Sequence, residues 1–490
     1  MSTELLREPG TVSAASLLSE LPPVLRVPAA LDRIRAELVA TGTRNIVLDD
    51  DPTGTQTVCD VPVLTSWSEQ DLRWALDAGP GTYYVLTNTR SQGEDEAVRR
   101  NEQVARHLRA AVDAAGAGVR ARVISRCDST LRGHYPLETD VQQAHAGAAG
   151  TPYDGVLLTP CYLEAGRLTV DNVHWVRRGE DLVPVARTEY ARDATFGFSS
   201  ADLRDFVVEK SGERWSRADV VPLDLTTIRV GGPEGVRDVL LQVTGGRPVV
   251  VNAAADEDLE VVVLGLQLAE RAGRRFLHRC GPSLVRVLGG LPRRPPLTYE
   301  EIYPAGPRSG HGLVVVGSHV GNSTRQLDEL LALGQVEHVE LDVPALLASD
   351  DAPAVVRALA TRVRQALGTA DVVLTTSRSL VTGATPDASL ALSRQVSRAL
   401  VDVVAAVHAD GPLRFVVAKG GITSSDIATA GLGIARATVL GQVLPGMVSV
   451  WSPVPTGGTD VTGLPFVVFA GNVGSPSALA DVVARLRGEG

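Results

Sequence analysis

The sequence has few aromatic residues, almost no methionine and no long uninterrupted run of apolar residues. Of its 490 residues, 7 are Phe and 2 are Met, whereas 48 are Gly and 44% are hydrophobic. This aliphatic composition is ordinary for a soluble α/β protein built from buried strands and glycine-rich loops, and it excludes general disorder. Because no run approaches the roughly 20 apolar residues of a transmembrane helix, a membrane-spanning protein is also excluded.

An excess of positive charge is missing as well. The formal net charge is −10 and the sequence pI is about 5.5. We therefore expect no general attraction for nucleic acid or for an anionic membrane surface. Any anionic ligand must be held by local positive groups.

Cysteine and secretion signals are scarce too. The 4 Cys are widely spaced and form neither a CxxC pair nor a zinc-type Cys/His pattern. Reduced thiols of this kind are typical of cytosolic proteins. The N-terminal segment places Arg7, Glu8 and Pro9 where a signal peptide needs apolar residues, so we expect a cytoplasmic protein.

The length and the hydrophobic pattern predict two α/β domains. A chain of 490 residues exceeds the size at which one core stays efficient. Short β-branched runs alternate with helical patterns, which indicates βα units and a parallel sheet. We expect strands at 46–48, 83–86, 122–124, 155–158, 249–251, 313–316, 371–374, 415–417 and 465–469.

The domain boundaries follow from composition. Residues 291–312 are rich in Pro and Gly and have no periodic face, which indicates a linker. We therefore expect a helical arm at 1–44, a first domain at 45–290 and a second at 313–490, with residues 161–227 as an insertion or long loops. Each domain would hold a mainly parallel sheet flanked by helices, with the active site in the cleft between the domains.

Several catalytic patterns are absent. The sequence contains no GxxxxGK[ST], HExxH, GxSxG or EF-hand loop. GLGIAR at 431–436 is an incomplete GxGxxG that follows no convincing strand, so a Rossmann NAD site is discounted. His134, His174 and His319 lie near strand ends, but a lone His is more often structural, and we assign none of them to catalysis.

An acidic turn follows the apolar run at 46–48. Asp49, Asp50 and Asp51 precede a Pro and a Thr-Gly pair, both good turn formers, and no nearby Lys or Arg offsets the three acids. Ligands of open α/β sheets bind at the carboxyl ends of strands. The stretch is therefore either a solvated turn or a site for Mg²⁺ or a polyhydroxylated substrate.

A second strand-end loop, SRCDSTLRG at 125–133, combines arginines, a carboxylate and hydroxyls. One interpretation is a helix cap with an internal Arg–Asp pair. The other, which we favour, is an anion-binding loop beside a carboxylate that deprotonates a hydroxyl. Arginine suits a carboxylate or phosphate because its planar fork donates two parallel hydrogen bonds.

Three strand–glycine–helix turns occur in the second half, at Gly317, at Gly420–Gly421 and at Gly471. Glycine lets backbone N–H groups approach an anion, and the N-terminus of the following helix adds a favourable dipole. Such turns are common without a ligand. Three of them in one domain nevertheless favour a nucleotide-phosphate site.

Together these motifs resemble the four-carbon acid sugar kinase family, which includes 3-oxotetronate, D-threonate and D-erythronate kinases. The resemblance runs in order from about residue 45 to the C-terminus. Arg126 stands where many members have Lys, and Ala194 and Ala470 stand where Pro is expected. The matching motifs are DDPTG at 50–54, DSTLRG at 128–133, GR-x-T at 166–169, Gly-Ser at 317–318, KGGIT at 419–423 and GNVG at 471–474.

The resemblance implies a sugar-acid-binding domain, a nucleotide-binding domain and transfer of the ATP γ-phosphate, with Mg²⁺, to a hydroxyl of a tetronate or 3-oxotetronate. Asp128 would be the base and Arg132 its catalytic partner, with Asp50 and Asp51 as the other candidate bases. Substrate contacts would come from Asp50, Asp51, Thr53, Arg90, Arg126 and Ser129. ATP contacts would come from Ser318, Gly420, Gly421, Ile422, Thr423, Gly471, Asn472 and Gly474. Asp49 lies outside the matched motif and is interpreted as a turn residue.

Two other functions stay open. A non-catalytic sensor of sugar acids and nucleotides would keep both domains, although it would be marked by loss of the acids or glycines, which are present. An ATP-dependent carboxylate ligase would use the same loops and an additional acceptor. The sequence leaves open which acid and which hydroxyl react, and whether the protein is a monomer or a homodimer.

Overall fold

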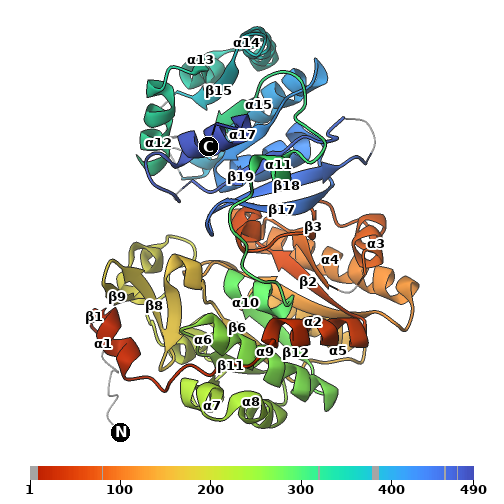
Figure 1. Cartoon of the computed structure of the whole chain (residues 1–490), viewed down its shortest axis with the longest axis vertical. Coiled ribbons are helices and arrows are strands. Elements are labelled where there is room, and N and C mark those ends of the chain that lie inside the picture. The colour runs from red at the N-terminus through yellow and green to blue at the C-terminus, as the bar shows by residue number, and fades with distance from the viewer. Residues whose placement is uncertain are drawn as a thin grey trace. The chain divides into compact units, whose positions relative to one another are not determined.

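The computed structural model describes residues 9–79, 81–317, 321–377, 386–456, 460–471 and 473–489, with the backbone alone at 386–391, 393 and 422. The chain divides into two compact units (Figure 1). The first unit comprises Met1–Gly54 and Trp67–Pro292, and the second comprises Thr55–Ser66 and Arg293–Gly490. The chain therefore passes from one unit to the other after residues 54, 66 and 292.

A parallel sheet forms the centre of the first unit. Its strands follow the order β10, β11, β6, β12, β5, β2, β4, and each neighbouring pair is parallel. Strand residues such as Val47, Ile124 and Leu157 are fully buried, as expected where helices cover a parallel sheet. The strands are β2 (Thr43–Asp49), β4 (Gly81–Leu86), β5 (Arg120–Arg126), β6 (Gly155–Thr159), β10 (Val221–Leu223), β11 (Arg247–Val251) and β12 (Phe276–Cys280).

Two groups of helices accompany this sheet. In one group α4 packs against both α3 and α5, and in the other α9 packs against α2, α7, α8 and α10. The first group is α3 (Glu69–Asp77), α4 (Glu94–Ala115) and α5 (Leu137–Ala148). The second group is α2 (Ala30–Thr41), α7 (Leu225–Arg229), α8 (Gly232–Leu241), α9 (Asp256–Arg271) and α10 (Pro282–Leu288).

The region expected as an insertion or long loops is folded and has its own core. A small antiparallel sheet joins β1 (Val12–Ser13), β9 (Asp181–Pro184), β8 (Val173–Arg178) and β7 (Arg167–Val170). Phe198 and Phe206 meet edge to face, with ring centroids 5.6 Å apart, and share a core with Val176 of β8. Phe206 belongs to α6 (Leu203–Lys210). The N-terminal arm contributes β1 to this sheet, besides α1 (Ala14–Ser19) and α2.

The second unit has a mixed sheet. Its strands follow the order β3, β17, β18, β19, β16, β13, β15, β14; the pairs from β3 to β19 are antiparallel and those from β19 to β14 are parallel. The strands are β3 (Val61–Leu64), β13 (Leu313–Val316), β14 (Val336–Leu341), β15 (Asp371–Thr376), β16 (Val416–Lys419), β17 (Arg436–Leu444), β18 (Val448–Val454) and β19 (Phe466–Phe469). The helices are α11 (Tyr299–Ile302), α12 (Gly321–Ala332), α13 (Val343–Ala348), α14 (Ala352–Ala366), α15 (Pro386–Ala409), α16 (Gly421–Asp426) and α17 (Ala478–Arg487).

The predicted fold class is confirmed: the chain has two α/β units with mainly parallel sheets flanked by helices, and every strand expected from the sequence overlaps an observed one. Two strands of the second unit were not predicted from the sequence. One is β17, in which buried and half-buried residues alternate, and the other is the short β3. Among the described residues, no helix is long and apolar enough to cross a membrane.

Candidate active site

Several strands of the first unit end at one level of the sheet. Asp49 at the end of β2 is in register with Arg126 of β5 and with Leu86 of β4, and Arg126 is in register with Cys280 of β12. The loops that follow these strands therefore meet at the carboxyl edge of the sheet, where open α/β sheets bind ligands. This edge collects the acidic turn, the DSTLRG loop and Arg90.

Asp49 is not a solvated turn residue, and that prediction is wrong. It ends β2, is fully buried, and accepts a hydrogen bond from Nη1 of Arg126 at 3.2 Å. Burial and the nearby charges of Asp50 and Asp51 raise its pKa to about 7 despite Arg126. A Cβ at Gly54 would lie 1.8 Å from Oδ2 of Asp49, so the buried carboxyl requires glycine at that position.

Asp50 and Asp51 share one arginine from another strand end. Arg90 donates from Nη2 to Asp50 at 2.5 Å and from Nη1 to Asp51 at 3.2 Å. Burial raises the pKa of Asp50, whereas Arg90 and hydrogen bonds from Thr53 outweigh burial and lower the pKa of Asp51. Sequence neighbours could not offset the three acids, but Arg90 and Arg126, brought by β4 and β5, do so in the fold.

Asp128 is held by its own loop. It accepts hydrogen bonds from Thr130 Oγ1 at 2.6 Å and from Arg132 Nε at 2.8 Å. Burial would raise its pKa, but Arg90, Arg132 and Thr130 together lower it well below the usual range. Arg132 also lies 3.7 Å from Asp193. Asp128 is therefore an ionised hydrogen-bond acceptor at any physiological pH.

A buried ion pair that sequence reasoning missed supports this edge. Arg279 of β12 donates from Nη1 to Glu138 at 2.5 Å and to Ser125 at 2.7 Å. Gly133 has a φ of +129°, and a Cβ there would lie 2.9 Å from both Arg279 and Asp50. Arg279 and Glu138 lie far from the acidic turn in the sequence, and no local pattern links them.

The small sheet brings two further side chains to the DSTLRG loop. Arg167 of β7 donates from Nη1 to Ser129 Oγ at 2.9 Å. His174 of β8 lies 2.7 Å from the Ser129 carbonyl through Nε2 and 3.0 Å from Thr169 Oγ1 through Nδ1. Because burial lowers the pKa of His174 to about 4, the ring is neutral and donates from Nε2. His174 thus holds the loop through these two contacts.

The glycine turns of the second unit also lie at one level. Lys419 at the end of β16 is in register with Val316 of β13 and with Phe469 of β19. Gly420 follows with a φ of +126°, which strongly favours glycine. A Cβ at Gly317 would lie 2.4 Å from Thr423 Oγ1 at the start of α16, so the turns after β13 and β16 approach closely.

Side chains of α12 hold the GNVG turn through its backbone carbonyls. Ser323 donates to the Gly471 carbonyl at 2.8 Å, and Gln326 donates to the carbonyls of Val473 at 3.0 Å and Ser475 at 2.7 Å. Gln326 is fully buried. The sequence indicated the glycines but not these neutral side chains, because their partners lie almost 150 residues away.

Lys419 is a fully buried lysine at the end of β16, next to Gly420. Its Nζ donates to the Ala470 carbonyl at 3.2 Å and lies 3.7 Å from the centroid of the Phe469 ring. Burial lowers its pKa to about 7. Lys419 therefore links the ends of β16 and β19.

The structure brings together within the first unit all of its predicted site residues: Asp50, Asp51, Thr53, Arg90, Arg126, Asp128, Ser129 and Arg132. Gly420, Gly421, Thr423, Gly471 and Gly474 lie at the carboxyl edge of the second sheet. Ser318 and Asn472 lie outside the described residues, and Ile422 is described by its backbone alone.

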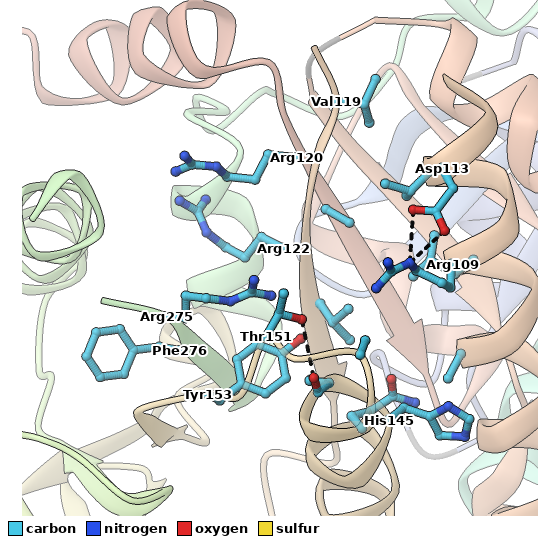
Figure 2. A pocket seen from close by; sticks show the side chains of 18 of the residues that line it. Arg109, Asp113, Val119, Arg120, Arg122, His145, Thr151, Tyr153, Arg275 and Phe276 are labelled. Carbon is cyan, nitrogen blue, oxygen red and sulfur yellow. Dashed lines mark hydrogen bonds and ion pairs between the residues drawn. The ribbon is translucent and has the colours of Figure 1, made fainter. Parts of the chain in front are cut away.

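A pocket in the first unit lies at the opposite edge of the sheet. It is lined by Arg120 and Phe276, the first residues of β5 and β12 (Figure 2). Several of its arginines have carboxylate partners, such as Arg109 with Asp113. Helices α4 and α5 also end here, and arginines are favourable near helix C-termini. Within the described chain its lining includes none of the predicted site residues, and we assign it no part in the site.

Metal ligands are not concentrated at either edge. In the part of the chain that the structure describes, no three His, Cys, Asp or Glu side chains are grouped as a metal site. Mg²⁺ that accompanies a nucleotide needs only one or two carboxylates, because phosphates and water supply the remaining oxygens. Asp51, whose side chain is 22% exposed, fits that requirement.

Comparison with known families matches both units. A sugar-binding N-terminal domain matches residues 45–288, and a nucleotide-binding C-terminal domain matches residues 313–479. No curated protein matches the chain. The two matched segments contain the two strand-end sites described above.

Two solved structures share the fold. One is a Salmonella typhimurium LT2 protein proposed to be a tRNA synthase, with a TM-score of 0.64 and 18% identity over 90% of this chain and 98% of that chain. The other is a Haemophilus influenzae protein of the family DUF1537, with a TM-score of 0.59 and 18% identity over 89% of this chain and 98% of that chain. At this identity the likeness concerns the fold alone.

Proposed function

Because the chain belongs to the four-carbon acid sugar kinase family, with its sugar-binding and nucleotide-binding domains, we propose that it transfers the γ-phosphate of ATP to a hydroxyl of a four-carbon sugar acid. One observation carries the proposal. The sugar-binding unit gathers carboxylates and arginines at its strand ends, whereas the nucleotide-binding unit gathers glycine turns at its strand ends. Carboxylates recognise hydroxyl groups, and glycine turns recognise phosphates.

The acid would be held by the acidic turn and the DSTLRG loop. Asp51 and Asp128 are ionised and have oxygens that can accept further hydrogen bonds from sugar hydroxyls. Ser129 adds a hydroxyl beside them, and Thr53 fixes the orientation of Asp51 by two hydrogen bonds. These contacts would position the reacting hydroxyl, which is the main task of a kinase active site.

Asp128 would orient the reacting hydroxyl and accept its proton. A carboxylate with a lowered pKa is a weak base, but a loose phosphoryl-transfer transition state requires orientation more than early proton removal. Arg132, bound to Asp128, would neutralise charge on the transferring group. Asp50 has a raised pKa, which suits a proton acceptor better, but Arg90 holds it in a buried position.

The nucleotide would bind at the carboxyl edge of the second sheet. Backbone N–H groups at Gly420, Gly421 and Gly471 can approach phosphate oxygens without steric hindrance, and α16 begins directly after Gly420. Mg²⁺ would be held chiefly by the phosphates of ATP and by water, and it would neutralise charge on the phosphates. Transfer requires both ligands to be bound at once.

The proposal is tested by incubating the protein with Mg-ATP and D-threonate, D-erythronate or their 2- and 3-oxo forms. ADP release together with a phosphorylated acid, identified by ³¹P NMR, is the expected result. AMP or an acyl product would indicate a ligase instead. Binding of acid and nucleotide without any product would indicate a sensor, and either result would overturn the kinase.

Asp128→Asn and Asp50→Asn separate two of the three candidate bases. If Asp128 accepts the proton, its Asn variant loses about 10²–10⁴-fold in kcat, whereas Asp50→Asn chiefly loses acid affinity. The reverse pattern would identify Asp50 as the base. Asp113→Asn, at an exposed ion pair on α4, is the matched control.

A further inference from the structure

The arginines of the first unit differ in whether a carboxylate already occupies them. The edge of a guanidinium that Nε and Nη2 form can donate two parallel hydrogen bonds to one carboxylate. Arg90 directs this edge at Asp50, with Nη2 at 2.5 Å and Nε at 3.2 Å. Arg132 directs it at Asp128, with Nη2 at 2.7 Å and Nε at 2.8 Å. Neither arginine has that edge free for a substrate.

Arg167 is the exception. Its Nη1 is bound to the hydroxyl of Ser129 at 2.9 Å, and its Nε is buried without a hydrogen-bond partner. Within the described residues, no carboxylate forms an ion pair with Arg167. Its Nε–Nη2 edge is therefore free, and an unsatisfied buried donor costs about 1–3 kcal/mol, which an anionic ligand would recover.

Two aromatic rings fix the orientation of this guanidinium. Its carbon lies 5.7 Å from the centroid of Tyr162 and 5.8 Å from that of Tyr190. The backbones of Tyr162 and Arg167 exchange two hydrogen bonds, so the tyrosine is held against the base of the arginine. Tyr190 also lies 5.1 Å from the guanidinium carbon of Arg132. These contacts position Arg167 but do not pair its charge with a carboxylate.

Three other arginines have a buried Nε without a hydrogen-bond partner. Arg286 already pairs with Asp256 at 2.8 Å, and Arg414 belongs to the second unit. The third, Arg126, is also less suitable. Its side chain is only 5% exposed, and it already faces the carboxyls of Asp49 at 3.2 Å and Asp50 at 3.8 Å. A substrate carboxylate there would meet two acidic groups. Arg167 has no such neighbour within ion-pair distance in the described chain, although its charge contributes to the low pKa of Asp128.

We infer that Arg167, with the hydroxyl of Ser129, forms a subsite that binds the carboxylate of the sugar acid through the Nε–Nη2 edge. Ser129 is the neighbour of Asp128 in the chain. The bound carboxylate and the hydroxyl that donates a hydrogen bond to Asp128 would therefore belong to nearby carbons. The subsite therefore selects short hydroxy acids over polyols of the same length. This inference rests on the proposed sugar-acid kinase function and names the group that distinguishes its substrate.

The subsite is tested by calorimetric titration of the full chain, without nucleotide, with D-erythronate and D-threonate and with the uncharged polyols erythritol and threitol. We expect the wild type to bind at least one acid more tightly than its polyol. Arg167→Gln should raise the Kd of that acid about 10–100-fold, the equivalent of a charged hydrogen-bond pair, without weakening the polyol. Arg167→Lys, which keeps the charge and loses the fork, should recover only part of the affinity.

The control is Arg177→Gln, which removes an exposed arginine from β8 of the same small sheet and should leave the Kd unchanged. An unchanged acid Kd in Arg167→Gln would overturn the subsite. A fall in kcat at constant KM for the acid would also overturn it, since Arg167 would then act on the transferring phosphoryl group.

Failure of the subsite is distinguishable from failure of the kinase. Acid binding that depends on Arg167, without any phosphorylated product, would refute the kinase and support the subsite. Phosphorylation of an acid with equal efficiency by wild type and Arg167→Gln would support the kinase and refute the subsite.

Discussion

The two candidate sites at the strand ends differ in whether side chains or backbone groups form them. In the first unit, charged side chains form the site, and Arg90 and Arg132 hold the carboxylates in place. In the second unit, the backbone of glycine turns forms the candidate site, and neutral side chains of α12 such as Gln326 hold it. Side chains can distinguish one hydroxyl arrangement from another, whereas backbone N–H groups bind any phosphate. The first site is therefore suited to selection, and the second to a ligand that many proteins share.

The largest effect is expected from removing a charge in the first site. Asp128→Asn should lower turnover about 10²–10⁴-fold, because the reacting hydroxyl loses its ionised acceptor. The affinity for ATP should stay within twofold of the wild type, since the proposed nucleotide site consists of backbone N–H groups of the second unit. Steady-state kinetics and a nucleotide titration measure both values. A large loss of ATP affinity would show that nucleotide binding also depends on Asp128.

The second site should respond to a methyl group rather than to a charge. Gly420→Ala forces a residue with a Cβ to a φ of +126°, at a cost of about 1–3 kcal/mol. This cost corresponds to a loss of roughly 5–150-fold in ATP affinity if the turn shifts. Acid affinity should not change. Gly463→Ala is the control, because its φ of +66° is also positive but a Cβ there would meet nothing within 4 Å. Equal ATP affinity in both variants would contradict a backbone phosphate site.

A smaller effect is expected from the neutral supports of the second site. Gln326→Ala removes two part-buried hydrogen bonds, to the carbonyls of Val473 and Ser475. The free energy of unfolding should therefore fall by about 1–3 kcal/mol, and ATP affinity severalfold. Glu329→Ala, on the exposed side of the same helix, should do neither. Chemical denaturation and calorimetry provide the two measurements. A drop in stability with unchanged ATP affinity would restrict Gln326 to a folding role.

The smallest effect concerns pH. Burial lowers the pKa of Lys419 to about 7 in the folded chain, below its unfolded value of about 10.5. The unfolded chain therefore binds more protons between these values, and this lysine makes stability rise with pH across that window. Lys419→Met should gain about 2–4 °C in melting temperature relative to the wild type at pH 7.5, and less at pH 9.5. A difference that does not vary with pH would exclude this titration.

Much of the fold and part of the site could be predicted from the sequence. Parallel strands place their carboxyl ends at one edge, so the residues after 46–48 and 83–86 could be expected to meet. Arg90 and Asp50 do meet, at 2.5 Å. The glycine turns could be expected together for the same reason. These successes depend on short-range patterns combined with one rule of sheet topology.

The rest depends on contacts between distant segments. Arg279 reaches Glu138 across 141 positions, and Gln326 reaches Ser475 across 149. Arg167 had a motif but no assigned role, because nothing in GRLT indicates that its fork stays free. The burial of Asp49 was missed because three adjacent acids are expected to face solvent. Only the fold shows that Arg90 and Arg126 lie beside them.

The passage of residues 55–66 into the second unit limits how this protein can be divided. Strand β3 pairs with β17 at the edge of the second sheet, yet it lies in the chain between two segments of the first unit. A fragment that starts at residue 293 would lack β3 and expose the backbone of β17, and unpaired edge strands promote aggregation. Neither unit is a continuous stretch of the gene. Expressing the nucleotide-binding half alone would thus require grafting a copy of residues 55–66 onto it, and a domain exchange among relatives would have to move two pieces rather than one.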